Sequence, residues 1–267
     1  MTLDARRTAL WHAMGLGPLW HPRDATVDAV AAPVTAGPTA PTASTAVIEP
    51  ASPAAIAVPV AARAPASDAT TAALDWPELE QAVAACTACG LCRSRRQTVF
   101  GVGNVRAEWM LIGEAPGAEE DARGEPFVGQ AGKLLDNMLA SVGLSRDGED
   151  PRRSVYIANV LKCRPPGNRN PEPAEVAQCE PFLKRQLALV QPRLVLVMGR
   201  FAAQSLLGTD ASIASLRGRV HQVQIDGRQV PVVVTYHPAY LLRNLADKAK
   251  SWADLCLAKA VAAGRTS

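Results

Sequence analysis

The chain has 267 residues and a net charge of +3, and 48% of its residues are apolar although only 4% are aromatic. The length allows one large domain or two small ones. The low aromatic fraction indicates that alanine in a non-packing segment raises the apolar count. The net charge is too small to predict a partner. No apolar run reaches the roughly 18 residues of a membrane span and no secretory signal is present, so we expect a cytoplasmic protein whose clustered thiols bind metal or act in catalysis.

The N-terminal part of the chain is expected to lie outside the folded domain. Residues 24–75 are mostly alanine, proline, threonine, valine and serine, which cannot bury enough apolar surface to fold and predict a disordered linker. Residues 1–23 place Leu10, Met14 and Leu16 at near-helical spacing, which is typical of an amphipathic docking peptide. This peptide resembles the one by which the psi subunit of bacterial DNA polymerase III reaches the clamp loader, and would bind a replication protein. The alternative is a short helix that packs on its own domain.

From residue 76 onward, apolar runs alternate with helical patterns and predict one folded domain. Four runs lack an alternating polar face and are separated by helices, which is typical of a parallel sheet covered on both faces. We therefore expect an α/β fold with a mainly parallel sheet and a hairpin through Asp226 and Gly227 before the last strand. The expected strands are 108–114, 154–161, 193–199 and 230–236, and the expected helical segments are 76–85, 134–142 and 176–187.

A glycine-rich, acidic motif follows the first expected strand, at the position where parallel sheets place their sites. The stretch GEAPGAEED (113–121) combines a tight turn, which brings backbone N–H groups close to a ligand, with four carboxylates that argue against a phosphate loop. Phe127 follows in GEPFVGQAG, where its ring either stacks on a base or packs in the core.

A polar residue and a basic loop end the second expected strand. The amide of Asn159 carries a donor and an acceptor, which suits the edge of a pyrimidine, although it alternatively caps the end of the sheet. Lys162, Arg164 and Arg169 lie in a loop rich in glycine and proline and suit contacts with phosphates.

The last expected strand ends at His237 in TYHPAYLLRN (235–244). A histidine at this position of a parallel strand favours a functional role. Leu241 and Leu242 stand beside Arg243, which is the pattern of an apolar wedge between bases next to a phosphate contact.

The motifs GEAPGAEED…PFVGQAG, NVLKCRPPGNRNP and YHPAYLLR occur in this order and together resemble those of the family 4 uracil-DNA glycosylases, the bacterial and archaeal iron–sulfur class. The resemblance implies that residues 76–267 form a three-layer α/β/α sandwich on a four-stranded sheet. It implies an enzyme that flips uracil out of DNA and hydrolyses its N-glycosidic bond, acting as a monomer close to the nucleoid. The alternative function is a non-catalytic DNA-binding iron–sulfur or zinc protein tethered to the replication machinery.

The resemblance also implies roles for individual residues. The catalytic positions would be Glu114, His237, Glu120 and Asp121. The uracil pocket would be formed by Ala115, Phe127 and Asn159. The contacts with DNA would come from Lys162, Arg164, Arg169, Leu241, Leu242 and Arg243. A 4Fe–4S cluster would be held by Cys86, Cys89, Cys163 and Cys179, the same thiols that zinc would use, whereas Cys92 and Cys256 have no counterpart as ligands.

Overall fold

The computed structural model describes residues 68–265, so the expected docking peptide (1–23) and most of the expected linker (24–75) lie outside the described residues. The last part of that linker segment is helical, because α2 covers Asp68–Ala72 and the Thr71 side chain is buried. Helix α2 packs on α6, and the folded domain therefore begins before residue 76. Among the described residues, no helix has the length and apolar character needed to span a membrane.

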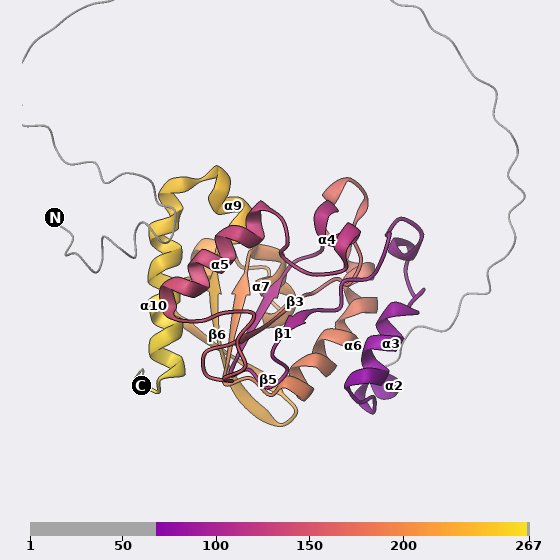
Figure 1. Cartoon of the computed structure of the whole chain (residues 1–267), viewed down its shortest axis with the longest axis horizontal. Coiled ribbons are helices and arrows are strands. Elements are labelled where there is room, and N and C mark those ends of the chain that lie inside the picture. The colour runs from indigo at the N-terminus through magenta and orange to yellow at the C-terminus, as the bar shows by residue number, and fades with distance from the viewer. Residues whose placement is uncertain (1–67, 266–267) are drawn as a thin grey trace, which may run out of the picture. The chain divides into compact units, whose positions relative to one another are not determined.

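A six-stranded sheet forms the centre of the domain, in the order β1-β3-β2-β4-β6-β5 (Figure 1). The four expected strands are its parallel core, and every residue of β2, β3 and β4 is buried because both faces are covered. Two antiparallel strands are added at the edges, β1 beside β3 and β5 beside β6. The strands are β1 (Val102–Gly103), β2 (Trp109–Gly113), β3 (Val155–Asn159), β4 (Leu194–Met198), β5 (Val220–Ile225) and β6 (Arg228–Thr235).

The α/β class and the parallel core are thus confirmed, while the sheet has two more strands than the four expected. The expected hairpin is also confirmed, since β5 and β6 are joined through Asp226 and Gly227. Both residues have positive φ, 46° and 76°, as a two-residue turn with the twist of a β-hairpin requires.

Helices cover both faces of the sheet, and alternate residues of β2 show the two layers (Figure 1). Leu111 packs with α5, α9 and α10, whereas Met110 and Ile112 pack with α6, α7 and α8. Helices α2 and α3 add a further layer outside α6. The α-helices beyond α2 are α3 (Trp76–Ala84), α4 (Ala118–Arg123), α5 (Gln130–Val142), α6 (Pro173–Val190), α7 (Arg200–Leu207), α8 (Ile213–Leu216), α9 (Pro238–Arg243) and α10 (Lys248–Ala262). Three short 3-10 helices are η1 (Gly90–Arg93), η2 (Pro166–Asn168) and η3 (Leu245–Asp247).

Candidate active site

A cleft of about 770 Å³ opens at the carboxyl ends of the parallel strands, where an open α/β sheet places its ligands. The cleft lies between α4 and α9, which stand at the same end of the domain (Figure 1). It brings together side chains that the sequence distributes over three motifs. The residues with an expected role that line it are Glu114, Ala115, Glu120, Phe127, Asn159, Arg169, His237 and Arg243.

Glu114 directly follows β2 and is partly buried in the cleft. Its backbone is fixed, because the carbonyl of Glu114 accepts a hydrogen bond from Leu161 N at 3.1 Å, which extends the pairing of β2 with β3. Burial raises the pKa of the Glu114 carboxyl above its usual range, and the Arg200 guanidinium partly lowers it again. A carboxylate in this position can orient a water molecule or stabilise positive charge.

Phe127 and Asn159 meet at the floor of the cleft, over Gly113. Both side chains are buried, with exposed fractions of 5% and 2%. A Cβ on Gly113 would overlap Asn159 Oδ1 and approach Phe127 Cζ to 2.8 Å, so only glycine leaves room for the pair. Asn159 Oδ1 has no hydrogen-bond partner among the described residues. A buried amide oxygen without a partner is costly unless a ligand satisfies it, which supports a binding role for Asn159.

His237 lies just past the end of β6 and caps the N-terminus of α9. Its Nδ1 accepts a hydrogen bond from Ala239 N at 3.2 Å, so a neutral ring carries its proton on Nε2. Burial lowers the pKa of His237 to about 4, an effect that Glu120 opposes and Arg243 reinforces. The imidazole is therefore neutral at pH 7 and available as a hydrogen-bond donor through Nε2.

Glu120 and Asp121 support loops rather than present free carboxylates. The two oxygens of Glu120 accept hydrogen bonds from three backbone amides, those of Gly117, Val128 and Gly129. Asp121 is buried, does not line the cleft, and accepts a hydrogen bond from Arg96 N at 2.9 Å. The catalytic role expected for Asp121 stays a prediction, and its position in the interior gives that role no direct support.

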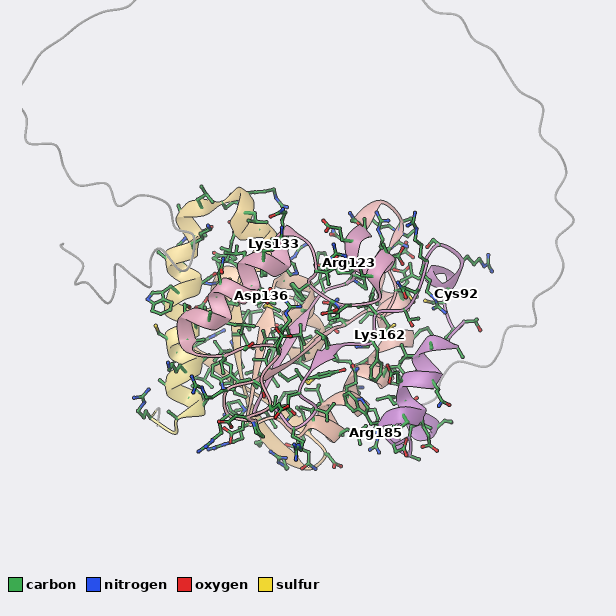
Figure 2. All side chains as sticks on the ribbon, in the orientation of Figure 1. Cys92, Arg123, Lys133, Asp136, Lys162 and Arg185 are labelled. Carbon is green, nitrogen blue, oxygen red and sulfur yellow. The ribbon has the colours of Figure 1, made fainter. Side chains whose placement is uncertain are left out.

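The basic loop after β3 differs from the expectation. Lys162, labelled in Figure 2, is only 1% exposed. Its Nζ donates to Asn159 O at 2.8 Å and to Gln186 Oε1 at 2.6 Å. The expected contact of Lys162 with DNA is therefore wrong, because the ammonium is consumed inside the domain. Arg164 remains partly exposed, with Nε bound to Asn168.

Arg169 reaches the cleft but is held by acidic neighbours. Its guanidinium donates to both carboxylate oxygens of Glu175, at 2.6 and 2.9 Å, and lies 3.2 Å from Glu172. Two carboxylates compensate its charge locally, so Arg169 contributes less to phosphate binding than an unpaired arginine would.

The two leucines of the last motif separate into different environments. Leu241 is fully buried in the core beside α5 and α10, so its expected role as a wedge is wrong. Leu242 is 42% exposed, and Leu245 in the next turn is 64% exposed. Arg243 lines the cleft beside them. The exposed apolar surface beside Arg243 is therefore formed by Leu242, with Leu245 following it.

Arg200 is a charged residue of the cleft that lies outside the three motifs. It begins α7 directly after β4 and Gly199, whose φ of 95° turns the chain. The rule that located the other motifs, a polar residue just past a parallel strand, applies to it as well.

Five cysteines surround a second, small cavity next to the cleft. The four cysteines expected to bind a cluster line this cavity, and Cys92 lines it as well. Cys256 lies exposed on α10. The thiols come from the α3–η1 segment, the loop after β3 and α6. They are Cys86, Cys89, Cys92, Cys163 and Cys179. Within residues 68–265, no three histidine, cysteine or acidic side chains are grouped closely enough to hold a metal ion.

The surroundings of these thiols suit thiolate chemistry. Arg95 Nη1 donates to Cys163 Sγ at 3.0 Å, and Lys162 N donates to Cys179 Sγ at 3.5 Å. Burial raises the pKa of Cys179 to about 12, so its thiolate needs a positive partner such as a metal. Leu91 and Leu161 pack around the sulfurs in an apolar shell. The chemistry of these donors therefore suits a thiolate-bound metal or iron–sulfur group, although the described side chains are not grouped closely enough to hold a metal ion.

Comparisons with known proteins agree with this geometry. The sequence profile of the uracil DNA glycosylase superfamily matches residues 100–258. The chain is 45% identical over 169 residues to a type-4 uracil-DNA glycosylase of Archaeoglobus fulgidus, covering 62% of this chain and 82% of the relative. It is 40% identical over 171 residues to a type-4 uracil-DNA glycosylase of Thermotoga maritima, covering 64% and 84%. A type-5 uracil-DNA glycosylase of Thermus thermophilus is 34% identical over 151 residues, covering 52% and 68%.

Proposed function

The chain belongs to the uracil DNA glycosylase superfamily, and from that membership we propose that it hydrolyses the N-glycosidic bond of uracil in DNA and leaves an abasic site. The observation that carries the proposal is the meeting of Glu114, Phe127, Asn159 and His237 in one cleft. Relatives named type-4 uracil-DNA glycosylases match this chain over most of their own length. A degraded, non-catalytic site is disfavoured because all four side chains are present and converge.

The cleft suits a base that has been taken out of the duplex. The glycosidic bond is inaccessible in the stack, so the nucleotide must be flipped at a cost of a few kcal/mol. The ring of Phe127 offers a stacking surface, and the unpartnered amide oxygen of Asn159 offers an acceptor for the N–H of uracil. Cytosine presents an acceptor at that position, which would leave two acceptors facing each other without a hydrogen.

The charges of the cleft match those that develop as the bond breaks. The sugar becomes cationic, and the carboxylate of Glu114 stabilises it and orients the attacking water. The uracil leaves as an anion, and the Nε2–H of His237 donates a hydrogen bond to it. Since burial lowers the pKa of His237 to about 4, the ring stabilises the departing base as a neutral hydrogen-bond donor and not as a cation.

The rim of the cleft supplies contacts with DNA. Leu242 is placed to fill the gap left by the flipped nucleotide, and Arg243 follows it on α9. Arg164 and Arg200 add positive charge near the cleft.

The cysteine cavity would hold a 4Fe–4S cluster through Cys86, Cys89, Cys163 and Cys179. A bound cluster would act as a structural cross-link, and zinc remains the alternative for the same thiols. These residues come from the segment before β1, the loop after β3 and α6. A cluster bound to them would therefore link the basic loop to the segment before β1.

The expected docking peptide (1–23) would tether this monomeric enzyme to the replication machinery at the nucleoid. Removing residues 1–67 tests this, because excision by residues 68–267 would persist while a replication partner would no longer be retained.

The experiment that tests the function is incubation with an oligonucleotide carrying one uracil, followed by alkali to cut at abasic sites. Cutting at the uracil is expected for the wild-type protein and not for an oligonucleotide carrying cytosine there. Glu114→Ala is the matched control for a contaminating glycosylase. Absence of cutting by folded, metal-loaded wild-type protein would contradict the proposal.

A further inference from the structure

We propose that Arg146 is a positioning residue that holds the Phe127 platform in its base-stacking conformation. The inference rests on the proposed function and adds to it a residue outside the cleft and outside the three motifs. Arg146 lies in the loop between α5 and β3, and its side chain is 10% exposed.

The guanidinium of Arg146 binds two consecutive backbone carbonyls of the Phe127 loop. Nη1 donates to Pro126 O and Nη2 to Phe127 O, both at 3.1 Å. On its other edge, Nε donates to Asp136 Oδ1 at 2.8 Å, and Nη2 lies 2.7 Å from the same oxygen. Asp136 belongs to α5 (Figure 2). The arginine therefore links the loop to this helix. A planar fork with several fixed donors serves all three acceptors, which the single ammonium of lysine does not.

The loop needs such support because Phe127 has φ of 56°. A bulky residue in this region is strained by about 1–3 kcal/mol and keeps the conformation only when its surroundings impose it. Gly132 permits the arrangement, since a Cβ at that position would overlap Phe127 O. The conformation aims the ring over Gly113 and against His237.

Opposite charges hold the two sides of this segment. Arg146 takes the carbonyls of residues 126 and 127, while Glu120 Oε1 takes the amides of Val128 and Gly129 at 3.0 and 3.2 Å. A cation bound to carbonyl oxygens and an anion bound to N–H groups each match the dipole of the peptides they contact. The two side chains together hold the left-handed turn at Phe127.

Loss of the hydrogen bonds from Arg146 to the carbonyls of Pro126 and Phe127, here called the Arg146 clamp, should therefore act on stacking of the base and not on Glu114 or His237. Arg146→Gln is expected to raise the KM for a uracil oligonucleotide about 10-fold and to weaken binding of free uracil by a similar factor. It should leave kcat within about twofold, because stacking stabilises the ground state and the transition state equally. Arg146→Lys should fall between wild type and Arg146→Gln. Arg152→Gln is the matched control, because the Arg152 side chain is 76% exposed and pairs with Asp150 of the same loop, and it should change neither constant.

The decisive measurement is a double-mutant cycle with Phe127→Ala, read by KM, by calorimetric binding of free uracil, and by the thermal midpoint of every variant. If Arg146 acts through Phe127, its 10-fold effect disappears in the Phe127→Ala background. The same factor in both backgrounds, or a purely thermal effect, would overturn the inference. If Arg146→Gln does not fold, Arg146→Lys takes its place in the cycle. Failure of the wild type to excise uracil would contradict the proposed function. An active wild type in which the effects of Arg146→Gln and Phe127→Ala on KM are additive would contradict only the proposed role of Arg146.

Discussion

The ring of Phe127 lies against the imidazole of His237, with centroids 5.3 Å apart and planes inclined by 27°. The loop before α5 and the end of β6 thus fix each other's aromatic side chain at the floor of the cleft. Because each ring restricts the other, the stacking surface and the hydrogen-bond donor for the base are held as one unit.

This arrangement leads to a prediction about pH. The pKa of His237 is about 4, so the histidine stays neutral as pH rises from about 5 to 8 and its protonation should contribute no limb to the rate profile there. His237→Ala should lower the single-turnover rate about 100-fold across that range, since one preorganised donor is lost. A wild-type limb near pH 6.5 that vanished in His237→Ala would show that the ring titrates in its ordinary range.

A second prediction concerns the pair Glu114 and Arg200. Burial holds the pKa of Glu114 above its usual range, and the carboxylate is the active form, so the rate should fall as pH drops through that raised pKa. Arg200→Gln removes the charge that lowers the pKa, and the acid limb should move to higher pH. Arg200→Lys keeps the charge and should leave the limb near its wild-type position. Single-turnover rates at saturating DNA measure the shift, and an unmoved limb in Arg200→Gln would refute the coupling.

The neighbouring leucines of α9 should respond differently to truncation. Leu241→Ala removes a fully buried side chain and should cost about 2–5 kcal/mol of unfolding free energy. Leu242→Ala should leave the thermal midpoint unchanged but lower excision from double-stranded DNA more than from single-stranded DNA, because only the duplex needs its gap filled. Thermal melts and paired substrates measure both effects. Equal losses on the two substrates would argue against a wedge.

The cysteine cavity allows a fourth prediction. Cys163→Ser removes a proposed ligand of the cluster and should lose bound iron, visible absorbance and soluble protein together. Cys163 is buried, and its Sγ accepts a hydrogen bond from Arg95, so the substitution also disturbs the interior. Cys256→Ser is the matched control and should keep all three, since Cys256 is exposed on α10. Iron, zinc and sulfide analysis of the purified proteins also distinguishes a cluster from a zinc site. Iron retained at the wild-type level in Cys163→Ser would contradict its assignment as a ligand.

The parallel core could be predicted because the runs that form β2, β3, β4 and β6 are apolar without interruption. Strand β1 is only Val102 and Gly103, too short to leave a pattern in the sequence. The convergence of the motifs at one edge also followed from the strand ends, since parallel strands deliver their carboxyl ends to the same side.

Errors arose where a residue's role depends on a distant partner. Lys162 looks like a surface cation until Gln186 on α6 is seen to receive its Nζ. Leu241 and Leu242 are adjacent in the sequence, and only the orientation of α9 decides which of them enters the core. Arg146 carries no motif, because its partners are backbone carbonyls, which any residue provides.

Lys162 sets a limit for anyone who wishes to redesign this protein for another base. Its Nζ requires the carbonyl of Asn159, and its own backbone N–H faces the sulfur of Cys179. Side-chain substitutions at position 159 keep that carbonyl in place, so they are open to a library. Insertions or deletions between Asn159 and Cys163 would instead remove one of the two acceptors of this buried ammonium. New specificities should therefore be sought by exchanging side chains on a fixed backbone, with Lys162 and Gln186 left unvaried.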